Sequence, residues 1–312
     1  MAERLRDFVA DRGFSLSLEE RTDHPSPPMS HSLPLPSISA RLRRQAERDP
    51  EAVGTLLREL APGICDQIAR DGRDAALLSR WGTSCNFEGD ESKPIVTPPV
   101  LAAIGAIAGI ELDLVHPHAG LLHTYGYLFS TVRTSFGFKR ARWVRPGIAR
   151  GLGLPRDTLS ARPREGTLLA NVTAVAARFV PEIALGASDS IAAEAPARLD
   201  PDAFVRARLT EQIDTVEGKT PGRDWELRTD LVWYRSGHAG KNEHALLLYS
   251  IRTDGVQHLV TAFPAGAWMA KKLRKQAAQS TPIRTRYNAW MPGLTGHDAT
   301  GVRTWTEIPQ AT

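Results

Sequence analysis

The stretch Ala245-Leu-Leu-Leu-Tyr-Ser-Ile-Arg-Thr-Asp-Gly255-Val-Gln-His-Leu-Val-Thr-Ala-Phe263 holds the clearest structural pattern in the chain. Two runs rich in apolar side chains flank its Arg252-Thr-Asp-Gly255 segment. An Asp-Gly pair between such runs is a strong short-range indication of a β-hairpin. A similar run occupies residues 225–234. We therefore expect strands at 225–234, 245–253 and 256–263.

The N-terminal third has a helical pattern instead. Asp49-Pro50-Glu51 combines a capping side chain, a proline at the first helical position and an acid in the first turn. Apolar residues at helical spacing follow it as far as Leu60. Further helices are expected at 63–70 and 73–81. The apolar run at 100–110 is expected to be a buried helix or strand.

Between these two regions the polarity alternates as in half-buried strands. Expected strands lie at 111–115, 128–133, 138–145 and 167–179, with a hairpin turn at 134–137. One more strand is expected near the C-terminus, at 283–290. Asp200-Pro201-Asp202 predicts a helix that runs to about residue 217, and a basic helix is expected at 265–276.

Strands that come in runs, joined by short turns, favour an α+β fold. We expect an antiparallel sheet with helices packed on one side, and a helical N-terminal third. Residues 1–40 are predicted to be an N-terminal extension, with a short helix at 1–12 and a proline-rich strap at 22–37. Residues 41–312 are predicted to form a single α+β domain, with a candidate sub-boundary near 185–200.

Composition narrows the class of protein only modestly. The 312 residues carry a net charge of +4, so nucleic-acid binding is permitted but not required, and we do not expect it. The longest apolar run, 100–110, is shorter than the roughly 18 residues that cross a bilayer. The two cysteines, Cys65 and Cys85, form no CxxC pair. We expect a soluble cytoplasmic protein that does not bind membranes.

Three histidines gather in one short segment, at His116, His118 and His123, and Tyr125 follows them. Imidazole exchanges protons near neutral pH. We predict that His118 and His123 move a proton while Tyr125 orients or protonates the substrate. In an alternative, His116, His118 and His123 bind Zn²⁺ or Fe²⁺. In another, the histidines are structural and Pro117 and Gly120 shape a loop.

A basic stretch follows at 138–145. On a strand, Arg140 and Arg142 share one face and can present two guanidinium groups to an anion. Lys139 and Arg133 are candidates to join them. The alternatives are a solvated edge strand, in which cations prevent aggregation, and a nucleic-acid surface.

The polar, glycine-flanked segment at 82–91 is typical of a functional loop. Ser84 and Asn86 are candidate hydrogen-bond donors to a bound anion. Cys85 is a candidate nucleophile if a histidine lowers its pKa, and otherwise a buried, inert thiol.

Lys271, Lys272, Arg274 and Lys275 form a basic helix face. Such a face is usually just solvated. It would also fit an acidic protein partner, such as a carrier that delivers a tethered substrate in a biosynthetic pathway.

Together these features predict an enzyme that acts on a small anionic substrate, a carboxylate, phosphate or sulfate, by general acid–base chemistry of the lyase or hydrolase type. No cofactor is expected. The alternatives are a metal-dependent enzyme that uses the three histidines, and a non-enzymatic protein that binds nucleic acid or an acidic partner. No dinucleotide-binding, ATP-binding or zinc-protease motif is found in the sequence.

Overall fold

The computed structural model describes the chain from residue 33 onward, within one compact unit that spans 33–312. The described ranges are 33–87, 93–134, 137–143, 148–152, 154–183, 204–216, 225–234, 244–253, 255–266, 268–278, 283–284 and 298–308. The helix expected at 1–12, most of the proline-rich strap and the candidate boundary at 185–200 lie outside them. The first described helix crosses residue 40, where the extension was expected to end.

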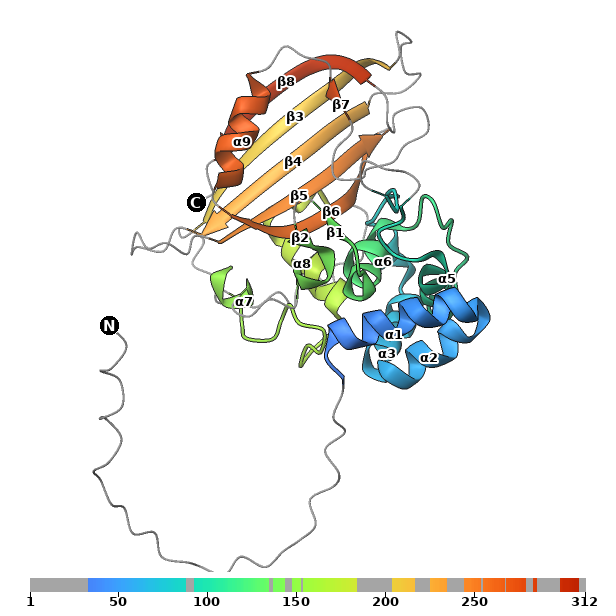
Figure 1. Ribbon diagram of the computed structural model, residues 1–312. Coiled ribbons are helices and arrows are strands. Elements are labelled where there is room, and N and C mark those ends of the chain that lie inside the picture. The colour runs from blue at the N-terminus through green and yellow to red at the C-terminus, as the bar shows by residue number, and fades with distance from the viewer. Residues whose placement is uncertain are drawn as a thin grey trace, which may run out of the picture. The chain divides into compact units, whose positions relative to one another are not determined.

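The N-terminal half of the described chain is helical (Figure 1). Its α-helices are α1 (Leu35–Arg48), α2 (Val53–Leu60), α3 (Pro62–Asp71), α4 (Ala75–Leu78), α5 (Pro98–Ala108), α6 (Ala119–Thr124), α7 (Ile148–Gly151) and α8 (Leu168–Phe179). Its 3-10 helices are η1 (Pro50–Ala52), η2 (Gly126–Phe129), η3 (Lys139–Ala141) and η4 (Pro181–Ile183). A small hairpin is formed by β1 (Arg133–Thr134) and β2 (Gly137–Phe138).

Local sequence explains where several of these helices begin and end. The Asp49 carboxylate accepts a hydrogen bond from the Ala52 amide at 3.4 Å, which confirms the predicted cap. Pro98 occupies the first turn of α5, and the helix ends at Gly109, whose φ of 72° is accessible to glycine without strain. The apolar run at 100–110 is therefore a helix, and most of it is buried.

The C-terminal part forms an antiparallel sheet in the order β6-β5-β4-β3-β8-β7 (Figure 1). Its strands are β3 (Phe204–Val216), β4 (Trp225–Tyr234), β5 (His244–Thr253), β6 (Val256–Gly266), β7 (Ile283–Arg284) and β8 (Asp298–Ile308), with α9 (Trp268–Ala277) after β6. The predicted strands at 225–234, 245–253 and 256–263 are confirmed. So are the hairpin of β5 and β6, in which Thr253 pairs with Val256, and the α+β class.

A β-bulge between β5 and β6 changes which way the side chains of β6 point. Tyr249 pairs with Thr261 and Ser250 pairs with Leu259, so Val260 is an extra residue on β6. One extra residue reverses the alternation of side chains between the two faces. Gln257 and Thr261, which would share a face in a regular strand, therefore lie on opposite faces of the sheet.

The core has two parts. The larger cluster joins the helices to the strands, and includes Leu57 of α2, Ile104 of α5, Val172 of α8 and Leu248 of β5. The smaller cluster lies on the opposite face of the sheet, where α9 packs. It consists of Leu209, Leu231, Leu247, Phe263 and Leu273. Burial of both clusters supplies the main stabilising force of the fold.

Several expected elements are wrong. The expected strand at 167–179 is helix α8, and the Thr167 hydroxyl caps it by accepting a hydrogen bond from the Ala170 amide at 3.1 Å. The expected helix after Asp200 is strand β3. In this strand Ala207 and Leu209 are buried while Arg206 and Arg208 lie on the other face, which is the period of a strand.

The expected strand at 138–145 is also wrong, because β2 ends at Phe138 and the 3-10 helix η3 follows. Arg140 and Arg142 are thus not positioned by a shared strand face. Residues 111–115 form no strand, and of residues 128–132 the first two lie in η2 and the rest have no regular secondary structure. These segments are short, so packing decides their conformation more than periodicity does.

Within the described residues, every helix is too short or too polar to cross a membrane.

Candidate active site around His123

His123 lies in the last turn of α6, and His118 sets the start of that helix. The His118 Nδ1 atom accepts a hydrogen bond from the Leu121 amide at 3.3 Å, while its Nε2 atom lies 3.0 Å from the Leu78 carbonyl oxygen. A carbonyl can only accept, so Nε2 carries the proton and the ring is neutral. Burial lowers the pKa of His118, in agreement with this neutral form. His118 therefore serves as a helix cap.

The segment at 81–86 is held between β6 and the loop that precedes α6. The Gly82 amide donates to the Leu259 carbonyl at 3.0 Å, and the Ser84 amide donates to the Pro117 carbonyl at 3.1 Å. Trp81 Nε1 donates to the Thr173 hydroxyl of α8 at 2.9 Å. These bonds fix Ser84 in front of α6.

Three segments that are distant in sequence place a hydroxyl on each side of the His123 ring. Ser84 Oγ lies 2.8 Å from His123 Nε2, and Thr261 Oγ1 lies 3.1 Å from Nδ1. Thr261 faces His123 because the bulge at Val260 turns this part of β6 toward α6. Ser84, His123 and Thr261 are all buried, with exposed fractions of at most 2%.

Two cations and two aromatic rings lie beside this chain of hydroxyl and imidazole groups. The Tyr127 ring centroid is 4.6 Å from that of His123. Lys139 Nζ and Arg142 Cζ lie 5.5 Å and 5.3 Å from the Tyr127 centroid, and Arg142 Cζ also lies 4.4 Å from the Phe263 centroid. Both cations are within cation–π range of the Tyr127 ring.

The surroundings keep His123 neutral. Burial, and then the positive charges of Arg142 and Lys139, lower the pKa of His123 well below its ordinary value of 6.5. A neutral imidazole has one nitrogen that accepts and one that donates. Because either hydroxyl can take either role, His123 can accept the Ser84 proton at Nε2 while Nδ1 donates to Thr261. That is the arrangement a general base requires.

Four of the candidate residues from the sequence meet here: Ser84, His123, Lys139 and Arg142. Tyr125 and Asn86 do not. The Tyr125 hydroxyl donates to the buried Asp71 carboxylate at 2.5 Å. Asn86 forms a pair of hydrogen bonds with the backbone of Val96, at 2.8 and 3.0 Å.

The other candidates also have different surroundings. Arg140 Nη1 donates to the Ser130 carbonyl at 3.2 Å, and Arg133 is exposed on β1. His116 Nδ1 lies 3.6 Å from an oxygen of Asp113.

Metal binding by His116, His118 and His123 stays a prediction. Among the described residues no group of three or more histidine, cysteine, aspartate or glutamate side chains is arranged to hold a metal ion. Cys65 and Cys85 are both buried thiols. Burial raises the pKa of Cys65 to about 11, which makes this thiol a weak nucleophile at neutral pH.

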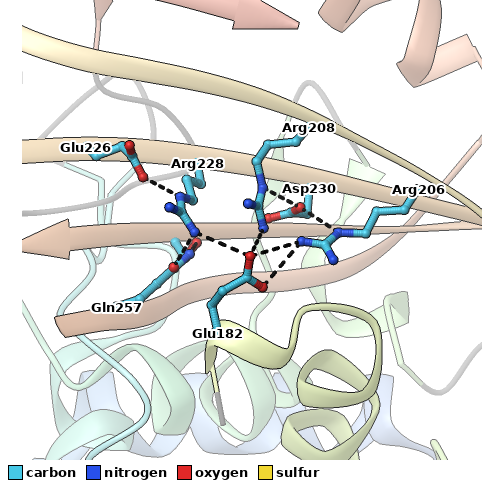
Figure 2. Close-up of polar contacts among 8 residues, drawn as sticks. Glu182, Arg206, Arg208, Glu226, Arg228, Asp230 and Gln257 are labelled. Carbon is cyan, nitrogen blue, oxygen red and sulfur yellow. Dashed lines mark hydrogen bonds and ion pairs between the residues drawn. The ribbon is translucent and has the colours of Figure 1, made fainter. Parts of the chain in front are cut away.

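A second polar cluster was missed entirely by the sequence reasoning. It lies on the face of the sheet opposite α9 and contacts η4 (Figure 2). Its members are Glu182, Arg206, Arg208, Glu226, Arg228, Asp230 and Gln257. Charged and apolar residues alternate at 206–209, and this pattern is typical of a strand. It was overlooked because the segment after Asp200 was predicted to be a helix.

Thr261 was not assigned to the site either. The strand that carries Thr261 was predicted, but the bulge that turns its hydroxyl toward His123 has no local sequence signature. Comparison with known protein families, curated proteins and solved structures finds no match to this chain.

Proposed function

We propose that the chain is an enzyme that performs general acid–base chemistry, of the lyase or hydrolase type, on a small anionic substrate. The observation that supports this most is the 2.8 Å contact between Ser84 Oγ and His123 Nε2, in a buried place beside two cations. This distance is within the range of about 2.6–3.2 Å that a base needs to reach the proton it removes.

In the proposed mechanism His123 Nε2 accepts a proton from Ser84, or from a substrate group that takes the place of the Ser84 hydroxyl. The Nδ1–H group donates to Thr261, and this bond holds the ring and its tautomer in place. The proton can return from Nε2 to the leaving group, so that His123 acts first as a base and then as an acid.

The substrate's negative charge has a specific part in this mechanism. Arg142 and Lys139 disfavour the protonated form of His123, so proton uptake by His123 is costly. A carboxylate, phosphate or sulfate bound between them would offset their charge and raise the pKa of His123 toward the working range. Acid–base activity would therefore depend on an anion being bound.

Substrate would approach from the side of Arg142. Ser84, His123 and Lys139 are buried, whereas Arg142 is half-buried. Arg142 is thus the cation whose side chain reaches solvent. Its guanidinium group can grip a carboxylate or phosphate with two parallel hydrogen bonds.

The test is to follow the ring resonances of His123 by NMR while phosphate, sulfate and acetate are added to the full chain. We expect at least one anion to shift these resonances and raise the pKa of His123. The Arg142→Gln variant should lose the effect. Arg140→Gln is the matched control, because Arg140 precedes it by two residues but donates to the Ser130 carbonyl.

No anion-dependent shift at His123, or an unchanged shift in Arg142→Gln, would contradict the proposal. The histidine resonance reports on this site alone, so anion binding elsewhere on the chain does not confuse the result.

One further observation supports an acidic protein partner. The side chains of Lys271, Lys272, Arg274 and Lys275 on α9 are exposed, while Leu273 between them is buried against the sheet. The helix therefore presents its basic face outward. We propose that this face receives an acidic partner, and that their association weakens steeply as salt concentration rises.

A further inference from the structure

Three arginines on the sheet direct their guanidinium groups at one carboxylate that comes from outside the sheet (Figure 2). Arg208 Nη2 lies 3.0 Å from Glu182 Oε1, Arg206 Nη2 lies 3.3 Å from Oε2, and Arg228 Nη1 lies 3.7 Å from Oε1. Glu182 belongs to η4, which follows α8.

The sheet holds these guanidinium groups in place without help from Glu182. The Nε atoms of Arg206 and Arg208 donate to the same oxygen of Asp230, at 3.1 and 2.9 Å. Arg228 is held in a similar way by a residue of its own strand, β4, and by a residue of β6. Its Nε contacts Glu226, and its Nη1 donates to Gln257 at 2.8 Å. Arg206 and Arg208 thus each use Nε within the sheet and direct Nη2 at Glu182, whereas Nη1 of Arg228 donates to Gln257 and also lies near Glu182.

The charges within the sheet are unbalanced without Glu182. The three guanidinium charges exceed those of Asp230 and Glu226 by one, and the Glu182 carboxylate supplies the missing negative charge. Burial raises the pKa of Glu182, but its backbone hydrogen bond and Arg208 and Arg206 outweigh this effect, so the pKa is lowered. Glu182 is therefore bound as the anion.

The position of Glu182 is open to exchange. Its side chain is 34% exposed, whereas those of the three arginines are 12–15% exposed and that of Asp230 is fully buried. We call Arg206, Arg208, Arg228 and Asp230 the arginine cradle. Their side chains are largely buried, whereas Glu182, which they bind, faces solvent.

We propose that Arg206, Arg208 and Arg228 form a binding site for the oxyanion of a small molecule, a carboxylate or phosphate group, which Glu182 occupies from within the chain. Planar guanidinium forks suit both kinds of oxyanion. A ligand would displace Glu182 and release η4 from the sheet. The second oxygen of Asp230, Oδ2, is buried without a hydrogen-bond partner among the described residues, and can accept from a hydroxyl or amine group of the same ligand.

The test is to titrate inorganic phosphate and acetate into the full-length chain and into its Glu182→Gln variant, with binding measured by calorimetry. The amide of glutamine has nearly the shape of the carboxylate but no charge, so an added anion no longer competes with a charged group. We expect at least one probe to bind the variant tenfold or more tightly than the original chain. The tighter probe identifies which oxyanion the cradle prefers.

Two matched variants complete this experiment. Glu165→Gln removes one exposed carboxylate that is not a member of the cluster, and should leave binding unchanged. Arg208→Gln added to Glu182→Gln should abolish the gain. A folded Glu182→Gln variant that binds neither probe more tightly than the original chain would overturn the proposal.

A second measurement needs no variant and so does not depend on folding of Glu182→Gln. Hydrogen–deuterium exchange at residues 180–183 of the original chain should become faster as phosphate or acetate is added, because η4 is released when Glu182 is displaced. The proposal would be overturned if exchange at residues 180–183 stays the same at every phosphate or acetate concentration that is too low to alter the bulk solvent. Neither readout involves His123.

Discussion

Ser84 Oγ lies 2.8 Å from His123 Nε2, although 39 residues separate them in the sequence. Two features hold the segment at 81–86 close to helix α6. The Gly82 amide donates to the Leu259 carbonyl and the Ser84 amide donates to the Pro117 carbonyl. In addition, the His118 side chain caps the start of α6. The site is therefore built by backbone bonds that tie three distant segments to one another.

Acid should destabilise the protein through His123. Its pKa is lower in the folded chain than the ordinary value of 6.5, so below pH 6.5 the unfolded chain binds a proton that the folded chain does not. The free energy of unfolding should then fall as pH decreases below about 6.5, by up to ~1.4 kcal/mol per pH unit for one such histidine. Urea unfolding at a series of pH values from 7.5 to 5 measures this fall in the free energy of unfolding. His123→Gln should show a shallower decline, and an equal decline in both proteins would contradict this account.

The cap provided by His118 can be measured separately. Replacing it by alanine removes the acceptor of the Leu121 amide and the donor to Leu78, and should lower the free energy of unfolding by about 1–2 kcal/mol. His118→Asn should recover much of the loss, since asparagine is one of the best capping residues. Equal stability of the two variants in chemical unfolding would show that capping is not what this side chain contributes.

Tyr125 is expected to act on stability rather than on chemistry. Its hydroxyl donates to Asp71, which also accepts from Thr167 at 2.6 Å, so one buried carboxylate joins α3 to α6 and to the start of α8. Burial raises the pKa of Asp71 despite these two hydrogen bonds. Tyr125→Phe removes one donor and should cost about 1–3 kcal/mol in unfolding experiments at pH 7. It should also raise the pKa of Asp71 further, and a variant as stable as the original chain would contradict the role.

Gly72 marks a tight contact between α3 and the end of α5. A Cβ atom at this position would lie 2.0 Å from the Ala108 carbonyl oxygen, which is backbone and cannot move alone. Gly72→Ala should therefore cost about 1–3 kcal/mol or more, as overpacked sites do. Gly63→Ala, in the first turn of α3 with nothing within 4 Å, is the matched control and should be nearly neutral. Thermal unfolding of the two variants compares them, and similar midpoints would contradict the packing described for α3.

The C-terminal strands could be predicted because their pattern is local. The run rich in apolar residues at 225–234 and the Asp-Gly pair at 254–255 indicate β4, β5 and β6 without reference to the rest of the chain. Helix α8 and strand β3 could not be predicted this way. Residues 168–179 include several β-branched side chains, but burial against α6 and the cap from Thr167 favour a helix. At β3, the apparent cap at Asp200 suggested a helix where pairing with β4 and β8 makes a strand.

Only part of the candidate site could be predicted, because residue types are visible in the sequence but contacts between distant segments are not. His123, Ser84, Lys139 and Arg142 were recognised by residue type, since such side chains are common in sites that handle anions. Their partners were not, because Thr261 joins them only through the bulge at Val260 and the pairing of β6 with the segment around Trp81. The arginine cradle depends on the register of β3 with β4, which sequence alone does not provide.

The most direct test of the proposed base is the tautomer of His123, read from the chemical shifts of its two ring nitrogens in ¹⁵N-labelled protein at pH 7. The account predicts a neutral ring with the proton on Nδ1, donated to Thr261, and with Nε2 accepting from Ser84. A Ser84→Ala variant should change the Nε2 shift and leave Nδ1 protonated. A proton found on Nε2 would contradict the account, because His123 would then donate to Ser84 and could not remove its proton.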